Sequence, residues 1–415
     1  MRHSLLPIAF LSLAGAATAG ENWPQFRGPH GDGLSDSKGL PLTWNEKENV
    51  VWKTPIHDRG WSSPVIWGDQ VWMTTATADG KKMFAVCVDR KTGDVVHDIM
   101  LFENEKPEPL GNPTNTYASP TPAIEEGRVY VHFGSYGTAC LNTKTGEKLW
   151  ERRDLPCDHF RGPASSPILY DSLVILQFDG VDVQYVAALD KATGRTVWKK
   201  DRTTDYGVPD GDHKKAYGTP SVIDVKGKME LVSPAAVATT AYNPRTGEEL
   251  WKVYHGGMNA ATPPLYGLGK VFLTTGDGGL KLLAVNPEGS GDLTKTNTEW
   301  TYNRNVPSHS SPILVDDLLF MANEGGMASC VDARDGTEVW RERLGGQFWA
   351  SPVYADGRLY FFDNDGTAVV AEPGRRWKKL AANKLDDGCM ASPAVAGKAL
   401  FVRTKTHLYR IEKKD

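Results

Sequence analysis

A Ser-Pro or Thr-Pro pair recurs eight times along the chain, each time ahead of a short apolar run. The pairs are Ser63-Pro64, Ser119-Pro120, Ser166-Pro167, Thr219-Pro220, Thr262-Pro263, Ser311-Pro312, Ser351-Pro352 and Ser392-Pro393. They lie on average about 47 residues apart, and a repeat of this length is typical of propellers and solenoids. The spacing therefore predicts one array of similar units.

Each unit is expected to contain four strands separated by tight turns. In the first unit, residues 65–67, 71–75, 83–88 and 94–101 alternate apolar and polar side chains or form short apolar runs. The intervening segments contain Gly68, Gly80 and Gly93, which are typical turn residues. The unit is therefore expected to be a four-stranded antiparallel sheet.

A second motif ends most units, and its fullest copy runs from Asp190 through Thr193 and Gly194 to Trp198. Asp begins a tight turn, Gly adopts a positive φ, and Trp can bury a large ring against the neighbouring unit. We expect this docking role for seven tryptophans: Trp52, Trp150, Trp198, Trp251, Trp300, Trp340 and Trp377.

The two ends of the repeat complement each other. The eighth unit lacks an outer strand after residues 406–412, whereas residues 50–52 have an outer-strand pattern without a preceding unit. If residues 50–52 complete the last unit, the array closes into a ring and no sheet edge of an open array remains. The predicted fold is all-β: a single eight-bladed β-propeller over residues 50–415, closed by an N-terminal strand in the last blade.

The first 49 residues form two further segments. Residues 1–19 combine a basic start, an apolar run and an Ala17-Thr18-Ala19 cleavage site, which is the pattern of a secretory signal peptide. No later apolar stretch is long enough to span a membrane, so we expect a soluble exported protein, periplasmic or secreted. Residues 20–49 are expected to form a belt whose Trp23 and Phe26 pack against the ring while Arg27, His30 and Asp32 stay exposed.

Charge and cysteine content exclude some classes of function. The net charge is −4, so the chain lacks the basic surface that nucleic-acid binding requires. Cys87, Cys140 and Cys330 occupy a strand position that holds Ala in other units, and we expect small buried side chains there. Cys157 and Cys389 lie ahead of first strands, and their disulfide state stays open.

The pattern from Ala188 through Asp190, Thr193 and Gly194 to Trp198 resembles the tryptophan-docking repeat of quinoprotein-like (PQQ-repeat) eight-bladed propellers. These include PQQ-dependent alcohol dehydrogenases and the outer-membrane assembly lipoprotein of the Bam complex. The resemblance covers about residues 50–412, and the opening from Trp23 to Gly33 is similar to that of exported bacterial PQQ-repeat-like propellers. It implies the fold, and it implies PQQ and calcium as possible cofactors.

One face of the ring holds the candidate binding residues. In a propeller, the connections between blades share a face with the loops between second and third strands, and such loops commonly carry function. The residues three places before the anchor prolines include five planar rings, which either stack on a ligand or plug the channel: Trp61, Tyr117, Tyr217, His309 and Trp349. The long connections before units three and four add His159, Arg161, Asp210, Asp212 and His213.

The chain contains no compact catalytic or metal-binding motif and no adjacent cysteine pair, and its turn carboxylates are dispersed over several blades. We therefore predict no catalytic or metal-ligating residue. The favoured function is a non-catalytic, monomeric scaffold that binds a protein or another cell-envelope partner. Two alternatives stay open: a PQQ- and calcium-dependent dehydrogenase of small alcohols or sugars, and a carbohydrate-binding propeller.

Overall fold

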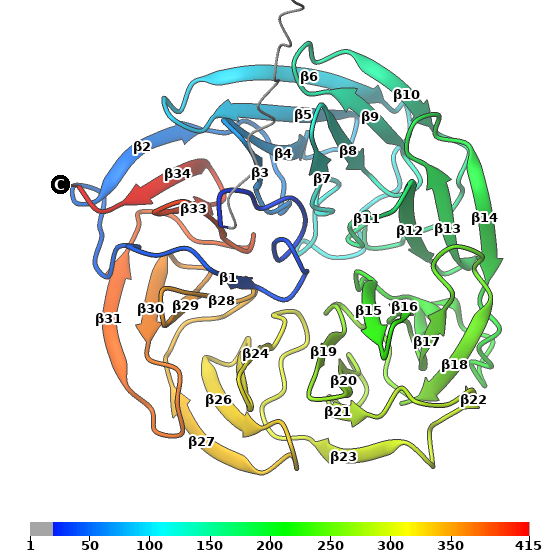
Figure 1. Ribbon diagram of the computed structural model, residues 1–415. Helices are drawn as coiled ribbons and strands as arrows, with labels where there is room; N and C mark the ends of the chain where they lie inside the picture. The colour runs from blue at the N-terminus through cyan, green and yellow to red at the C-terminus, as the bar shows by residue number, and fades with distance from the viewer. Residues whose placement is uncertain (1–19, 415) are drawn as a thin grey trace, which may run out of the picture.

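The computed structural model describes residues 20–414, and the expected signal peptide and its cleavage site lie outside these residues. Eight antiparallel sheets surround a central channel, as Figure 1 shows. Besides strands, the described chain contains one short 3-10 helix, η1 (Gly211–Lys214). The predicted eight-bladed all-β propeller is confirmed. No helix between residues 20 and 414 has the length and apolar character needed to cross a membrane.

The strands of each blade run from the channel to the periphery in chain order. Blade one contains β3 (Val65–Trp67), β4 (Gln70–Ala76), β5 (Lys82–Asp89) and β6 (Val95–Glu103). Blade two contains β7 (Ala123–Glu125), β8 (Arg128–His132), β9 (Thr138–Asn142) and β10 (Lys148–Arg152). Blade three contains β11 (Ile168–Tyr170), β12 (Leu173–Asp179), β13 (Gln184–Asp190) and β14 (Thr196–Asp201). Blade four contains β15 (Ser221–Val225), β16 (Lys228–Ser233), β17 (Ala238–Tyr242) and β18 (Glu249–Tyr254). Blade five contains β19 (Leu265–Gly267), β20 (Lys270–Thr274), β21 (Leu282–Val285) and β23 (Thr298–Tyr302). Blade six contains β24 (Ile313–Val315), β25 (Leu318–Ala322), β26 (Met327–Asp332) and β27 (Glu338–Arg343). Blade seven contains β28 (Val353–Ala355), β29 (Arg358–Phe362), β30 (Thr367–Ala371) and β31 (Lys379–Lys384).

The last blade combines both ends of the described chain. It contains β32 (Ala394–Ala396), β33 (Ala399–Arg403), β34 (His407–Glu412) and, as its outer strand, β2 (Val50–Pro55). β2 pairs antiparallel with β34, with Trp52 opposite Arg410. The expected closure by an N-terminal strand is confirmed.

The segment ahead of β2 does not wrap the ring as a belt; it crosses the middle of the ring, as the dark blue trace in Figure 1 shows. Trp23 exchanges two backbone hydrogen bonds with Ile66 of β3, and β1 (Leu34–Ser35) pairs parallel with β28. Innermost strands leave one backbone edge free toward the channel, so an extended segment can bond to several blades. Residues 20–35 therefore plug one end of the channel.

Arg27 in this plug is buried, contrary to the expected exposure. Its side chain is 2% exposed, and its guanidinium donates to the backbone oxygen of Pro312 at 2.8 Å. Burial lowers the pKa of Arg27 to about 10, partly offset by Asp32. Arg27 therefore ties the plug to blade six.

Five of the seven docking tryptophans donate the indole N–H to a backbone oxygen of the next blade, namely Trp52, Trp150, Trp198, Trp300 and Trp340. The indole N–H of Trp150, for example, donates to the backbone oxygen of Lys191, and its ring lies under Gly194. Across the sheet, Trp150 pairs with Cys140 and Trp198 pairs with Ala188. The small residue leaves room beside the indole ring, which explains why this position accepts Ala or Cys.

Two tryptophans differ from the expected arrangement. Trp377 lies in the turn before β31 rather than in an outer strand, and its ring packs 5.0 Å from that of Trp340 of the preceding blade. In blades two to six a large Trp of the outer strand lies opposite a small Ala or Cys of the third strand. In blade seven the small Ala381 of the outer strand β31 lies opposite the larger Val370 of β30. The indole N–H of Trp251 donates to the Glu230 carboxylate instead of to a turn carbonyl.

An insertion in blade five accounts for the burial of Trp251. The insertion forms β22 (Gly291–Asp292), which adds a fifth, parallel strand to the outer edge of blade four, with Gly291 beside Trp251. The Trp251 side chain is consequently fully buried, at 0% exposure.

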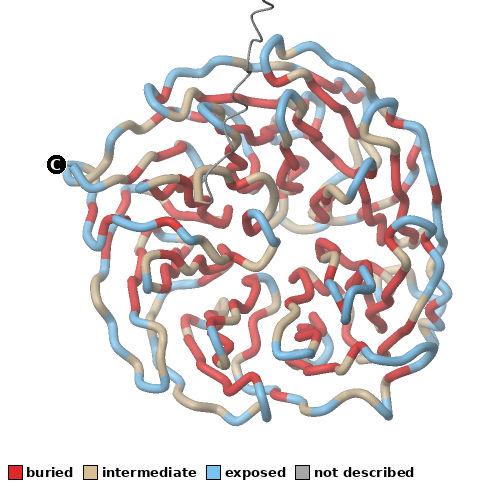
Figure 2. The backbone as a smooth tube through the Cα atoms, viewed as in Figure 1, coloured by how far each residue is buried: buried red, intermediate tan, exposed pale blue. Residues whose placement is uncertain are grey.

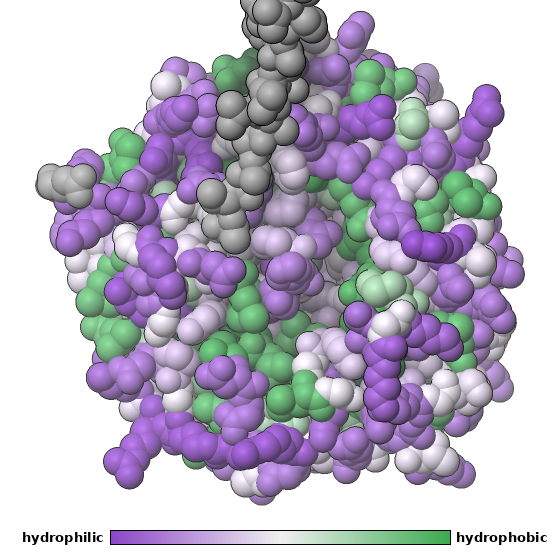
Figure 3. Space-filling view, in the orientation of Figure 1, coloured by the Kyte–Doolittle hydropathy of each residue, from purple (hydrophilic) through white to green (hydrophobic). Residues whose placement is uncertain are grey.

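The core lies within and between the blades, where buried residues (red in Figure 2) concentrate, while exposed residues lie mainly on turns and outer strands. Figure 3 shows a mostly hydrophilic face in the orientation of Figure 1, with hydrophobic residues near the middle and in smaller patches at the rim. All five cysteines are buried and free. Cys87, Cys140 and Cys330 fill the small strand position, as predicted, and Cys157 and Cys389 form no disulfide.

Candidate functional site

A ring of hydroxyl groups surrounds the channel just before the inner strands begin. In six of the eight blades, the backbone N–H of the residue in this ring donates to the side-chain hydroxyl of the next blade's residue. These bonds join Ser63 to Thr121, Thr121 to Ser166, Ser166 to Thr219, Ser311 to Ser351, Ser351 to Ser392 and Ser392 to Ser63, at 2.8–3.0 Å. The repeated hydroxyl therefore fixes the register between neighbouring blades.

This ring corrects two of the predicted anchors. In blade two the hydroxyl in the ring belongs to Thr121, so the anchor is Thr121-Pro122 and not Ser119-Pro120. In blade five β19 begins at Leu265, which places Pro263 in the ring and makes Pro264 the anchor instead of Pro263. Pro263 has no hydroxyl and no backbone N–H, so the ring of hydrogen bonds is interrupted there.

With this register, the eight residues three places before the anchor prolines all line one pocket at the channel mouth. In blade order they are Trp61, Ser119, Ala164, Tyr217, Ala261, His309, Trp349 and Met390. The larger apolar and aromatic side chains come from blades six, seven, eight and one, and the smaller or more polar ones from blades two to five. The pocket is therefore two-sided, with an aromatic wall and a polar wall.

The aromatic wall is held in place by specific contacts. The His309 and Trp349 rings lie 4.1 Å apart between centroids, at 39° to each other. The indole N–H of Trp61 donates to the backbone oxygen of Thr114 at 2.7 Å. Glu324 accepts from His309 at 2.8 Å. Burial raises the pKa of Glu324, but the hydrogen bond and charge of His309 outweigh it, and the net pKa is lowered.

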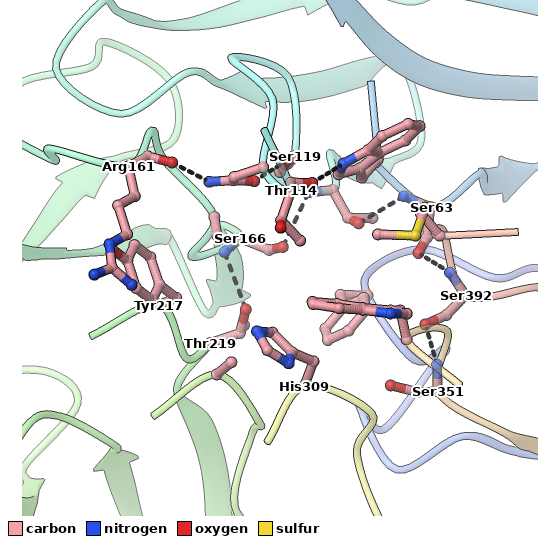
Figure 4. A pocket seen from close by; sticks show the side chains of 18 of the residues that line it. Ser63, Thr114, Ser119, Arg161, Ser166, Tyr217, Thr219, His309, Ser351 and Ser392 are labelled. Carbon is pink, nitrogen blue, oxygen red and sulfur yellow. Dashed lines mark hydrogen bonds between the residues drawn. The ribbon is translucent and has the colours of Figure 1, made fainter. Parts of the chain in front are cut away.

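The polar wall contains Arg161, Tyr217, Asn259 and Asp277. Figure 4 shows Arg161 beside Tyr217, across the pocket from Ser63, Ser351 and Ser392. Burial raises the pKa of the Tyr217 hydroxyl. Asn259 donates to the Asp277 carboxylate at 3.0 Å. Arg161 Nε, the Tyr217 hydroxyl and Asn259 Oδ1 are buried without a hydrogen-bond partner among the described residues.

Phe26 of the N-terminal plug reaches the inner end of this pocket. The same side chain also borders a second groove, which the plug forms with the inner strands of blades three and four. The pocket at the mouth contains about 990 Å³ of empty space, and this volume includes its open side. The plug therefore makes the channel a blind pocket, which the sequence alone did not indicate.

Five of the ten predicted binding residues line the pocket: Trp61, Arg161, Tyr217, His309 and Trp349. Tyr117 lies outside it because the anchor of blade two is shifted; its hydroxyl donates to the backbone oxygen of Glu108. His159 is buried, and its Nε2 accepts the backbone N–H of Ser135 at 3.1 Å. Burial lowers the pKa of His159 to about 4.

The remaining three candidates lie on or beside η1, next to the pocket. Asp210 precedes η1 and accepts the backbone N–H of Asp212, and His213 is exposed. Asp212 reaches Arg161 at 3.7 Å and contacts the buried Lys215. Burial, followed by the positive charge of Arg161, lowers the pKa of Lys215 to about 8. Asp212 thus supports the polar wall from behind.

Sequence reasoning missed several lining residues, namely Phe26, Asn112, Thr114, Asn115, Ser119 and Asn259. Ser119 could have been found only by choosing the second of two adjacent hydroxyl–proline pairs. Asn112, Thr114 and Asn115 belong to the long connection before blade two, whose side chains no periodicity places.

The lining residues do not supply a calcium set of the kind that PQQ enzymes imply. Calcium takes six to eight oxygen ligands. Asp277 is the only carboxylate lining the described pocket, and one of its oxygens already accepts from Asn259. Across residues 20–414, no group of three or more His, Cys, Asp or Glu side chains is placed to hold a metal ion.

Comparison with known proteins places this ring in a family. A family model described as "Outer membrane protein assembly factor BamB" matches residues 44–199 and 182–415. The chain belongs to this family. The expected resemblance to PQQ-repeat propellers is confirmed, since quinoprotein dehydrogenases are also among its relatives.

Individual relatives are distant. An outer membrane protein assembly factor BamB from Yersinia pestis is 22% identical over 252 residues, which is 60% of each chain. The quinoprotein alcohol dehydrogenase PedH from Pseudomonas putida is 32% identical over 31% of this chain and 22% of its own. The chain thus spans less than two thirds of these relatives.

Among solved structures, a quinohemoprotein alcohol dehydrogenase from Comamonas testosteroni superposes with a TM-score of 0.70 at 12% identity. The match covers 96% of this chain and 82% of that one. At this identity the similarity shows the shared fold alone.

Proposed function

We propose that this protein is an exported, monomeric, non-catalytic propeller that binds a protein or another cell-envelope partner through the face carrying the pocket. The observation that carries the proposal is the clustering of long connections on that face. Residues 104–122, 153–167 and 202–220 join consecutive blades, whereas the connection into blade seven is only residues 344–352.

These three connections support one another and form a raised docking ridge. The backbone N–H of Gly111 donates to the backbone oxygen of Phe160, which links the first connection to the second. Arg161 approaches Asp212, which links the second to the third. The ridge exposes the apolar side chains of Phe160 and Val208, at 44% and 41%, which a partner can cover.

The relatives support this proposal. The family and the Yersinia relative are described as outer membrane protein assembly factors. In sequence, the dehydrogenase PedH matches 31% of the chain against 60% for the Yersinia relative. Asp277 alone does not supply the oxygen ligands that the PQQ alternative would need. We propose that Trp61, Arg161, Tyr217, His309 and Trp349 form the binding face with the ridge.

Site-specific photo-crosslinking in the native host tests the proposal. A photoreactive amino acid replaces Val208 on the ridge or Gln347 at the pocket rim, both exposed, and replaces Lys144 in a turn on the opposite face as the control. We expect the same adduct from positions 208 and 347, and none from 144. Adducts from 144 alone, or none at 208 and 347, would overturn the binding-face assignment.

A further inference from the structure

We propose that the pocket at the channel mouth binds a neutral, hydroxyl-rich six-membered sugar ring. The ring is either a free sugar or one unit of an envelope glycan, because both present the same chemistry. The inference goes beyond the proposed function, since a sugar fills the pocket whether or not a protein covers the docking ridge.

The aromatic wall suits the apolar side of a sugar ring. Trp61, Trp349 and His309 line the pocket together with Met390. The two tryptophans are partly buried, and His309 is exposed. The C–H groups of a pyranose carry partial positive charge and pack on the electron-rich face of an aromatic ring. The packing of His309 against Trp349 holds the larger ring in place before a ligand arrives.

The polar wall offers both donors and acceptors. Arg161 Nε can donate, Asn259 Oδ1 can accept, and the Tyr217 hydroxyl can do both, yet none has a partner within residues 20–414. An unsatisfied buried polar group costs about 1–3 kcal/mol. A hydroxyl can both donate and accept, so a hydroxyl-rich ligand matches this mixture of donors and acceptors in the polar wall.

The hydroxyl ring adds more donors at the depth of the inner strands. Each hydroxyl of Ser63, Thr121, Ser166, Thr219 and Ser392 accepts a backbone N–H from a neighbouring blade, and no acceptor within the described chain takes its proton. A hydroxyl carries one donor and two acceptor positions. All five line the pocket, so their protons can reach the oxygens of a ligand.

The charges that line the pocket favour a neutral sugar over an anionic ligand. Arg161 is the only cationic side chain lining the described pocket, and Asp277 is the only carboxylate. A carboxylate ligand would be repelled by Asp277 and would have no proton to donate to Asn259 Oδ1, whereas a neutral ring can offer both acceptors a hydroxyl proton. The balance of donors, acceptors and charge therefore favours a neutral ligand with many hydroxyls.

The test is a binding screen on the purified protein, residues 20–415. A glycan array is followed by calorimetry with glucose, galactose, mannose and N-acetylglucosamine, and with their oligomers. Monosaccharide binding identifies a free sugar, and binding only of oligomers identifies a glycan unit. Trp349→Ala and Tyr217→Phe change the two walls, and Tyr170→Ala removes a ring from the separate groove beside the plug.

We expect at least one neutral sugar to bind wild type, with Trp349→Ala weakening it about tenfold or more and Tyr217→Phe about fivefold, because each removes a buried contact. Tyr170→Ala should stay within about twofold. The proposal is overturned if no sugar binds the folded wild type, or if both pocket variants bind the sugar as tightly as wild type does. It is also overturned if benzoate binds and no sugar does. If photo-crosslinking gives adducts at position 208 but no sugar binds the purified protein, this inference fails and the proposed function does not.

Discussion

The backbone N–H of Ser392 donates to the side-chain oxygen of Ser63 at 3.0 Å, although 329 residues separate the two in sequence. Both residues are buried, at 6% and 2% exposure. The bond joins the last blade to the first, so it closes the hydroxyl ring at the point where the chain also closes the propeller through β2 and β34.

Ser63→Ala should lower the free energy of unfolding by about 1–3 kcal/mol, because it leaves the buried N–H of Ser392 without an acceptor. Ser311→Ala is the matched control. Pro263 precedes Ser311 in the ring and has no N–H, so the Ser311 hydroxyl accepts no backbone donor and contacts only the Ser351 hydroxyl. Urea unfolding of both variants checks this, and equal losses would contradict the role of the inter-blade bond.

The same ring shows how far the sequence could be interpreted. Eight hydroxyl–proline anchors were enough to predict the number of blades, the strand order and the closing strand, because these depend on a repeat that every blade shares. The register inside a blade was less certain. Ser119-Pro120-Thr121-Pro122 contains two equivalent anchors, and only the bonds to Ser63 and Ser166 show that Thr121 belongs to the ring.

Only the part of the pocket that the repeat builds could be predicted from the sequence. Trp61, His309 and Trp349 occupy a repeated position, and the repeat places them at the channel mouth. Phe26 reaches the pocket through a plug whose contacts join distant parts of the chain, and no local pattern reports such contacts. His159 was predicted to bind a ligand because it is polar and in a loop, but a backbone N–H 24 residues away occupies its ring nitrogen.

Gly194→Ala should destabilise the protein more than Gly127→Ala. Both glycines have positive φ, +70° and +77°, where an L-residue costs about 1–2 kcal/mol. A Cβ on Gly194 would lie 2.7 Å from the Trp150 ring, whereas a Cβ on Gly127 meets nothing within 4 Å. The clash adds about 1–3 kcal/mol. Thermal and urea unfolding measure the difference. Equal losses of unfolding free energy in the two variants would show that the Trp150 ring can move aside without destabilising the protein.

Trp23→Ala should lower the free energy of unfolding by about 3–5 kcal/mol, because the side chain is 1% exposed and its loss leaves a cavity beneath the plug. Gln25→Ala, two residues along the same segment, should change it by less than about 0.5 kcal/mol, the range of ordinary surface changes. Urea unfolding compares the two. A small loss for Trp23→Ala would mean that the plug is not part of the cooperative fold.

His132 gives a prediction about pH. The side chain is 2% exposed, and its Nδ1 lies 2.8 Å from the Thr138 hydroxyl. Burial, with a smaller effect of His159, lowers the pKa of His132 to about 3, against 6.5 for an ordinary histidine. Below pH 6.5 the unfolded chain therefore takes up a proton that the folded protein does not. The free energy of unfolding should fall by about 1.4 kcal/mol per pH unit from this group between about pH 6 and 4.

His132→Asn isolates that contribution, because the amide can keep the hydrogen bond to Thr138 but does not titrate. The variant is expected to lose stability at pH 7 through its smaller volume, and to show a shallower decline toward pH 4.5 than wild type. Urea unfolding at pH 7, 6, 5 and 4.5 gives both slopes. His213→Asn, which changes an exposed histidine on η1, should leave the wild-type slope intact. Parallel curves for wild type and His132→Asn would show that His132 binds its proton equally in the folded and unfolded states.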